Sequence, residues 1–152
     1  MEYKSRNDVP NEYKWDLSKM YESDSEIEKD IEEVKKLTKE ILKYKSHILD
    51  SSNSLYEFLK LTEKQDRILE KLYVYSKMSL DVDTKNNKSK ALKMKIEKLS
   101  ESLNEEFSFI EPEMMSGSYE IVKSYMEENN KLKEYSFYLE DFYRFNHIHL
   151  LR

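Results

Sequence analysis

The sequence predicts an all-α fold, an antiparallel bundle of about four to five helices with an extended N-terminal arm. Three observations support this class. The 152 residues include one glycine and two prolines, so residues that form turns are scarce. Charged residues make up 38% of the chain, with many Lys, Glu and Leu, which favour helices. Apolar residues recur at steps of three and four positions, as they do on one face of a helix.

The first segment, residues 1–22, is predicted to be an extended aromatic arm. Pro10 disfavours helical geometry in the residue before it, and Tyr13, Trp15 and Leu17 alternate with polar residues. We expect the arm to pack its aromatic side chains on a single helical bundle domain formed by residues 23–152.

The first two helices are separated by the polar loop at 50–54. The first should begin near Asp24 with a capping box from Ser23 or Ser25, and carries an apolar stripe of Ile27, Ile31, Val34, Leu37 and Ile41. The second should be capped by Ser54 with Glu57 and run to about Leu80. Its inner side is predicted to hold Leu55, Phe58, Leu59, Leu69, Leu72, Tyr73 and Ser76.

The later helices are marked by caps and breakers. A third helix should follow a cap at Asp83 or Thr84 and end or kink near Pro112. Gly117, the single glycine, is predicted to have left-handed backbone at a helix end. A short helix over 118–128 should precede a final helix capped by Asn129 or Asn130. Because the apolar residues of that final helix surround its axis, we expect an apolar face that a further domain or partner chain covers.

The composition also excludes several classes of function. The formal net charge is −5 with the two signs mixed, which argues against a nucleic-acid partner. The absence of cysteine excludes disulfides and thiolate metal sites. No stretch is apolar enough for a membrane span or, within residues 1–10, for a signal peptide. We therefore expect a cytoplasmic protein with no membrane partner.

Histidines and carboxylates offer no convincing catalytic or metal site. His147 and His149 are two residues apart, so on a helix they point in nearly opposite directions, and His47 is remote in sequence. Pairs of neighbouring glutamates, such as those at 32–33, 105–106 and 127–128, are typical of solvated helix faces with lysines nearby. We expect no catalytic, metal or cofactor-binding residue in this chain.

The tyrosines are the stronger candidates for a binding surface. A tyrosine combines an apolar ring with a polar hydroxyl, which suits the edge of a core or the wall of a peptide-binding cleft. The core interpretation is favoured, because nothing in the sequence brings the rings together at a pocket. The tyrosines that could face a partner or a peptide are Tyr73, Tyr75, Tyr135, Tyr138 and Tyr143.

Four segments, taken in order, resemble the amino-terminal region of oligoendopeptidase F and its relatives among the thimet-oligopeptidase-like zinc peptidases. They are RNDVPNEYKWDL at 6–17, KLYVYS at 71–76 with the stretches 81–84 and 90–92 after it, SFIEPE at 108–113, and LKEYSFYLE at 132–140. Together they span nearly the whole chain.

The resemblance implies a non-catalytic wall of a deep cleft in a zinc metallopeptidase that hydrolyses short peptides. In that family the zinc is held by a His-Glu-x-x-His helix and a downstream glutamate, positions that would follow residue 152. We therefore expect no enzyme activity from this chain and zinc only in a separate catalytic domain. Its expected partners are a second copy of the chain, such a catalytic domain, or short peptides. The alternatives are a helical protein–protein interaction module with no peptidase role and, less favoured, an active enzyme.

Overall fold

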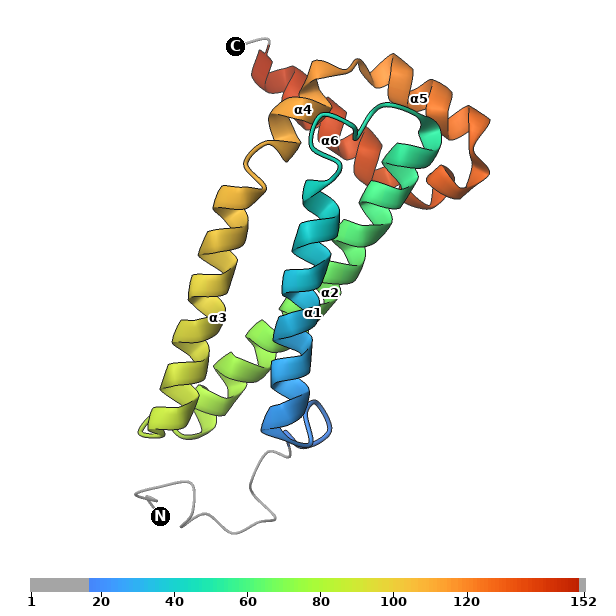
Figure 1. Cartoon of the computed structure of the whole chain (residues 1–152). Helices are drawn as coiled ribbons and strands as arrows, with labels where there is room; N and C mark the ends of the chain where they lie inside the picture. The colour runs from blue at the N-terminus through green and yellow to red at the C-terminus, as the bar shows by residue number, and fades with distance from the viewer. Residues whose placement is uncertain (1–16, 151–152) are drawn as a thin grey trace. The chain divides into compact units, whose positions relative to one another are not determined.

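A computed structural model of the protein describes residues 17–150, and the side chains of residues 17–145. The predicted arm thus lies largely outside the described residues. The described part contains six α-helices, one 3-10 helix and no strand, which confirms the all-α class (Figure 1). Five of the α-helices have ten residues or more, in agreement with the predicted number. The elements are α1 Asp24–Leu42, α2 Ser52–Val82, α3 Asn87–Glu106, α4 Ile110–Ser116, α5 Tyr119–Glu128, the 3-10 helix η3 Asn130–Tyr135 and α6 Ser136–Leu150.

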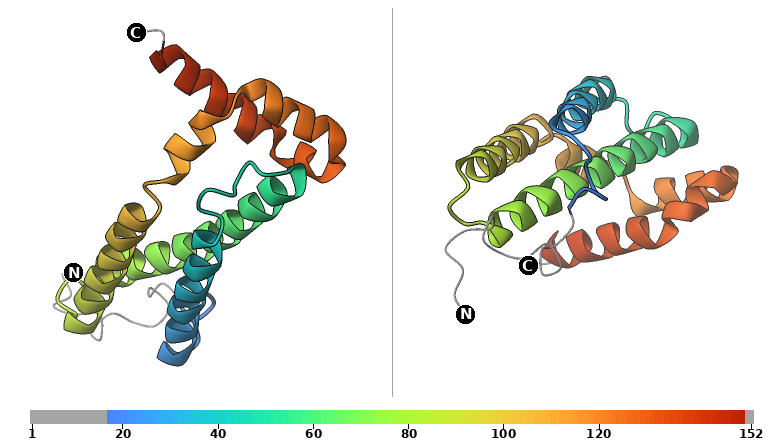
Figure 2. Two further views of the ribbon diagram at one scale, coloured as in Figure 1. Left: turned by 45° about the horizontal axis from the view of Figure 1, so that its top comes forward. Right: turned by 90° about the horizontal axis from the view of Figure 1, so that it is seen from below.

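The helices belong to two compact units, seen from two further directions in Figure 2. The first unit joins the described residues up to Lys36 to Gln65–Asn104, and the second joins Leu37–Lys64 to the described residues from Glu105 onward. Both α1 and α2 therefore contribute residues to each unit. A single globular domain over 23–152 stays a prediction. No helix in the described range 17–150 has the combination of length and apolar character that crossing a bilayer requires.

The first unit holds three helical segments together by burial and by exposed ion pairs. Ile27, Ile31 and Val34 of α1 are all less than 5% exposed, as the predicted stripe requires. Lys88 pairs with Asp24, and the Lys95 ammonium lies 2.7 Å from the carboxylate of Glu28. The remaining buried apolar side chains here are Tyr21, Leu72, Ile96 and Leu103. The earlier residue of α1 pairs with the earlier residue of α3, and the later with the later, so these two helices run parallel. The chain passes from α1 to α3 through α2.

The second unit has its own apolar core. Ile41, the last residue of the predicted stripe, is fully buried there, and Leu55, Phe58 and Leu59 of α2 are buried as predicted. The rest of the core comes from the loop before α2, from α2 itself and from the later helices: Ile48, Tyr56, Met114, Val122, Met126, Leu132, Leu139 and Tyr143. This core fixes the positions of α4, α5 and α6.

Several predicted helix starts are correct and others are shifted. Asp24 begins α1, and Ser118 caps α5 by accepting a hydrogen bond from the Ile121 N–H at 3.3 Å. The cap of α2 is Ser51 rather than Ser54, since its Oγ accepts the Ser54 N–H at 3.0 Å. The cap of α3 is Asn86 rather than Asp83 or Thr84. Its Oδ1 accepts the N–H groups of Lys88 and Ser89 at 2.9 and 3.2 Å.

The prediction of left-handed backbone at Gly117 is wrong. Its φ is −90° and its ψ is 155°, an extended geometry that any residue can adopt. Space around the glycine is limited instead, because a Cβ added there would lie 2.5 Å from Cδ1 of Leu49, so that the end of this side chain would have to move. The side chain of a residue in the loop after α1 therefore occupies the place that a larger residue would need.

The region from 106 to 136 also departs from a simple series of helices. The third helix ends at Glu106, and Pro112 lies in the first turn of α4, where its missing N–H costs nothing. Asn129 caps the next element as predicted, with its Oδ1 accepting the Lys131 N–H at 3.0 Å. That element is the six-residue 3-10 helix η3, however, and α6 begins only at Ser136.

Candidate functional site

The structure separates the predicted tyrosines by their environment. In the first unit, Tyr75 packs edge-on against Tyr21 with ring centroids 5.1 Å apart. Tyr73 is 46% exposed, so its predicted place on the inner side of the second helix is wrong. The inner positions of that turn are taken by Leu72 and Ser76, which are four residues apart on one face.

In the second unit, two of the three predicted tyrosines form hydrogen bonds through their hydroxyl groups. Tyr135 donates to the carboxylate of Glu63, and Tyr143 donates to the carbonyl oxygen of Met114 at 2.8 Å. Burial raises the pKa of Tyr143 to about 12, and the neighbouring Tyr138 adds to the shift. Tyr138 itself is 50% exposed.

No candidate metal centre emerges among the residues that the structure describes. In that part of the chain no three His, Cys, Asp or Glu side chains are grouped so that they could hold an ion. His47 lies with its Nδ1 2.7 Å from the carboxylate of Asp50, in an exposed pair. The side chains of His147 and His149 are outside the described residues.

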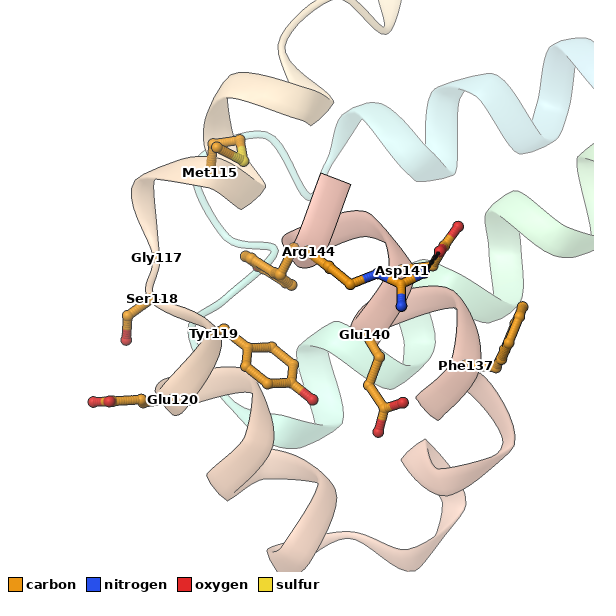
Figure 3. A pocket seen from close by; sticks show the side chains of 10 residues that line it. Met115, Gly117, Ser118, Tyr119, Glu120, Phe137, Glu140, Asp141 and Arg144 are labelled. Carbon is orange, nitrogen blue, oxygen red and sulfur yellow. Dashed lines mark hydrogen bonds and ion pairs between the residues drawn. The ribbon is translucent and has the colours of Figure 1, made fainter. Parts of the chain in front are cut away.

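The second unit contains a pocket of about 790 Å³ between the start of α5 and one face of α6 (Figure 3). A volume of this order suits a small ligand or a few residues of a peptide. Among the described residues, the lining comprises Met115, Gly117, Ser118, Tyr119, Glu120, Phe137, Glu140, Asp141, Tyr143 and Arg144. We call this hollow the α5–α6 pocket. Tyr143 is the one of the five predicted tyrosines that lines it.

Aromatic rings form one wall of the α5–α6 pocket. The rings of Tyr119 and Tyr143 lie 5.6 Å apart between centroids, and Tyr143 also contacts Phe142 edge-on at 5.1 Å. The Tyr143 hydroxyl donates to the carbonyl oxygen of Met114, which also accepts the Gly117 N–H at 3.3 Å, and this contact helps to hold the Tyr143 ring. The wall is therefore held in position from α4.

Charged side chains also line the pocket. Glu120, Glu140 and Asp141 contribute three carboxylates, although Figure 3 shows the Glu120 side chain directed away from the Tyr119 ring. Arg144 contributes one guanidinium, whose Nη2 lies 3.0 Å from Oδ1 of Asp141. Figure 3 shows the Tyr119 ring on the side of the pocket that Glu140 occupies. Burial, and then the charge of Glu140, raise the pKa of Tyr119. The formal charge of the lining is negative.

Residues 137, 140, 141 and 144 of this pocket follow the i, i+3, i+4, i+7 spacing of one helix face. The sequence therefore carried a signal for part of the site, a mixed aromatic and charged stripe. It carried none for Tyr119, whose approach to that stripe depends on the turn between α4 and α5.

A second hollow of about 560 Å³ lies where the loop after α1 meets α4. Ser46 lines it with a φ of 69°, a left-handed geometry that is uncommon for serine. The Ile48 N–H donates to Glu113 at 3.3 Å, and the Lys45 ammonium lies 5.6 Å from the Phe109 ring centroid. These contacts serve to hold the loop on α4.

Comparison with known proteins places this chain among peptidase sequences. No family model matches it. It is 35% identical over 141 residues to the plasmid-encoded oligoendopeptidase F of Lactococcus lactis subsp. cremoris, a match that covers 90% of this chain and 23% of that protein. The oligopeptidase PepF of Bacillus subtilis is 31% identical over 136 residues, which are 90% of this chain and 20% of that protein.

The structural comparison agrees. The crystal structure of oligoendopeptidase-F from Enterococcus faecium matches with a TM-score of 0.72 and 26% identity, over 79% of this chain and 24% of that one. The crystal structure of a putative peptidase from Chlamydophila abortus matches with a TM-score of 0.73 and 25% identity. The match covers 94% of this chain and 24% of that one. The chain thus spans less than a quarter of the length of these relatives. The resemblance seen in the sequence is confirmed: these residues are homologous to an amino-terminal segment of oligoendopeptidase F.

Proposed function

We propose that these 152 residues form a non-catalytic, cleft-wall part of an oligoendopeptidase F-like zinc metallopeptidase that hydrolyses short peptides. The observation that carries the proposal is the match to the Lactococcus lactis oligoendopeptidase F, which includes 90% of this chain but 23% of the relative. Nearly the whole chain is homologous to the relative, but it corresponds to a small part of that enzyme. Such a match is consistent with a structural part of a larger enzyme.

The chemistry of the residues supports a non-catalytic role. The 152 residues contain no His-Glu-x-x-His segment, in which two histidines one helical turn apart bind zinc and the glutamate acts as general base. The described residues also lack a cluster of three metal-binding side chains. The zinc of such an enzyme would therefore be held by residues other than these, in a catalytic domain.

The surface of α6 supports contact with further polypeptide. Phe137 is 81% exposed, Phe145 is 63% exposed and Tyr138 is 50% exposed, so one short helix presents three large aromatic side chains to solvent. Burying apolar area of this kind contributes about 25 cal/mol per Å². We infer that the face formed by Tyr138 and Phe145 is covered by a peptidase catalytic domain or by a second copy of the chain, while Phe137, about 100° away around the helix, lines the α5–α6 pocket.

The test is a peptidase assay of the 152-residue chain with a quenched bradykinin-like peptide, with and without added zinc, together with its zinc content after dialysis. We expect no turnover and no retained zinc in either condition, because no zinc-binding segment is included. Turnover that rises with zinc and stops with a chelator, in a preparation free of contaminating protease, would contradict the proposal.

A second candidate function is a helical interaction module with no peptidase role. The exposed aromatic face of α6 is the observation that favours it, since the same residues could dock any apolar surface. Sedimentation equilibrium at tens of micromolar measures whether the chain associates with itself. A strict monomer would argue against self-association through this face, and then the choice is between a catalytic domain and another protein.

A further inference from the structure

We propose that the α5–α6 pocket binds a basic side chain, an ammonium or guanidinium group on an apolar stem, presented by a peptide. The assignment goes beyond the proposed function, because it depends on the lining of the pocket and holds whether or not the chain acts in a peptidase. Its ligand is an arginine or lysine residue in an extended peptide segment.

The first argument is charge. Asp141 and Arg144 form a pair at 3.0 Å and largely neutralise each other, and Figure 3 shows the Glu120 side chain directed away from Glu140 and from the Tyr119 ring. Glu140 is therefore the carboxylate that lies beside the ring, and it attracts a cation and repels a carboxylate or phosphate.

The second argument is the aromatic wall. The rings of Tyr119 and Tyr143 lie side by side at 5.6 Å, and Phe137 lines the pocket from α6. A guanidinium or ammonium group is attracted to the face of an aromatic ring, and the aliphatic stem of Arg or Lys packs well on the same surface. Rings next to carboxylates therefore suit both parts of a basic side chain, whereas a purely polar ligand would leave the rings unused.

The start of α5 at the pocket does not reverse this preference. The partial positive charge of a helix N-terminus favours anions. Here the Ile121 N–H is already bonded to the Ser118 hydroxyl at 3.3 Å and to the Ser118 carbonyl at 3.2 Å, and Glu120 places a carboxylate in the first turn. The Ile121 N–H is thus satisfied within the chain, and the acidic first turn opposes an added anion.

The ligand test compares Nα-acetyl-arginine amide with Nα-acetyl-citrulline amide, which has nearly the same shape but no charge. Binding to the 152-residue chain is followed by changes in the NMR chemical shifts of the pocket residues. We expect the arginine compound to bind and the citrulline compound to bind about threefold to tenfold more weakly. Equal binding of the two, or no binding of the arginine compound at about 10 mM, enough to fill a site of millimolar affinity, would overturn the proposal.

Two charge variants give results of opposite sign. Glu140→Gln should weaken binding of the arginine compound about threefold to fivefold, while Glu127→Gln, the same change on α5 outside the pocket, should leave it unaltered. Arg144→Gln should strengthen binding about twofold to threefold, because it removes a like charge and releases Asp141. If Arg144→Gln weakened binding of the arginine compound instead, the charge argument would be contradicted. Circular dichroism confirms that each variant is folded.

The aromatic wall is tested by Tyr119. Tyr119→Phe keeps the ring and should preserve binding, whereas Tyr119→Leu keeps apolar volume without the ring and should weaken binding about twofold to fivefold. Equal binding by the two variants would remove the ring from the proposed mode of recognition and contradict it. Because the assay measures binding and not hydrolysis, its failure is distinct from failure of the proposed function.

Discussion

The hydroxyl of Tyr143 donates a hydrogen bond of 2.8 Å to the carbonyl oxygen of Met114, and so ties α6 to the last turn of α4. The two residues are 7% and 0% exposed, so water cannot replace either partner. This contact both closes the core of the second unit and orients one wall of the α5–α6 pocket.

Tyr143→Phe is expected to lower the free energy of unfolding by about 1–2 kcal/mol, because it leaves the buried Met114 carbonyl without its donor from α6. Urea denaturation followed by circular dichroism measures the change. Tyr73→Phe is the matched control: Tyr73 is 46% exposed, so the loss should be below about 0.5 kcal/mol. Equal losses for the two variants would show that the bond to Met114 is not a stabilising one.

Stability should fall in alkaline solution. In the unfolded chain a tyrosine loses its proton near pH 10, but in the folded chain the pKa of Tyr143 is raised to about 12 by burial. The unfolded state therefore binds fewer protons between these values, and stability present below about pH 10 is lost as the pH rises toward 12. Burial, with Asp30 and Glu63 respectively, also raises the pKa of Tyr21 and of Tyr135.

The check is the free energy of unfolding at several pH values from about 9 upward, for the natural chain and for Tyr143→Phe. The variant should show a shallower decline, with the remainder due to the other tyrosines. An identical pH dependence in the two proteins would mean that Tyr143 does not contribute to it.

Gly117→Ala should destabilise the protein by about 0.5–1.5 kcal/mol, since the new Cβ would lie 2.5 Å from Cδ1 of Leu49 and that side chain would have to leave its preferred rotamer. Leu49→Ala removes that atom, so adding Gly117→Ala to it should cost much less. A double-mutant cycle by urea denaturation gives the coupling. Simple additivity of the two changes would contradict the assignment of this cost to Leu49.

Ser46 has a φ of 69°, and replacements there should follow the cost of left-handed backbone. Ser46→Gly should raise stability by about 0.5 kcal/mol, and Ser46→Val should lower it by about 1–2 kcal/mol, because a β-branched side chain fits this geometry badly. Ser46 is exposed, so few contacts obscure the comparison. Thermal unfolding of the two variants gives the order, and a valine variant as stable as the glycine variant would disprove the backbone effect.

Periodicity in the sequence predicted the long helices and most of their buried faces. Ile27, Ile31, Val34, Leu37 and Ile41 repeat at helical steps, and all five are buried. The caps of α2 and α3 were misplaced because several Ser, Asp and Asn residues follow one another there. Each can cap a helix locally, and packing of the folded chain decides which one does.

Features that depend on residues distant in sequence could not be predicted. Gln65 stands in a highly charged stretch, yet it is 2% exposed and its Nε2 donates to the Val34 carbonyl oxygen at 3.0 Å. The space around Gly117 is limited by Leu49, and three helices, α2, α3 and α4, separate the two residues in sequence. Tyr119 was likewise not predicted as a site residue, because its contact with Tyr143 joins residues that are distant in sequence.

The most direct test of the central claim is a chimera of the Lactococcus lactis oligoendopeptidase F in which the aligned segment is replaced by this chain. If these residues are the equivalent part of such an enzyme, the chimera should fold, retain zinc and hydrolyse a quenched bradykinin-like peptide. A chimera that is folded and contains zinc but does not hydrolyse the peptide would contradict the claim and favour an interaction module.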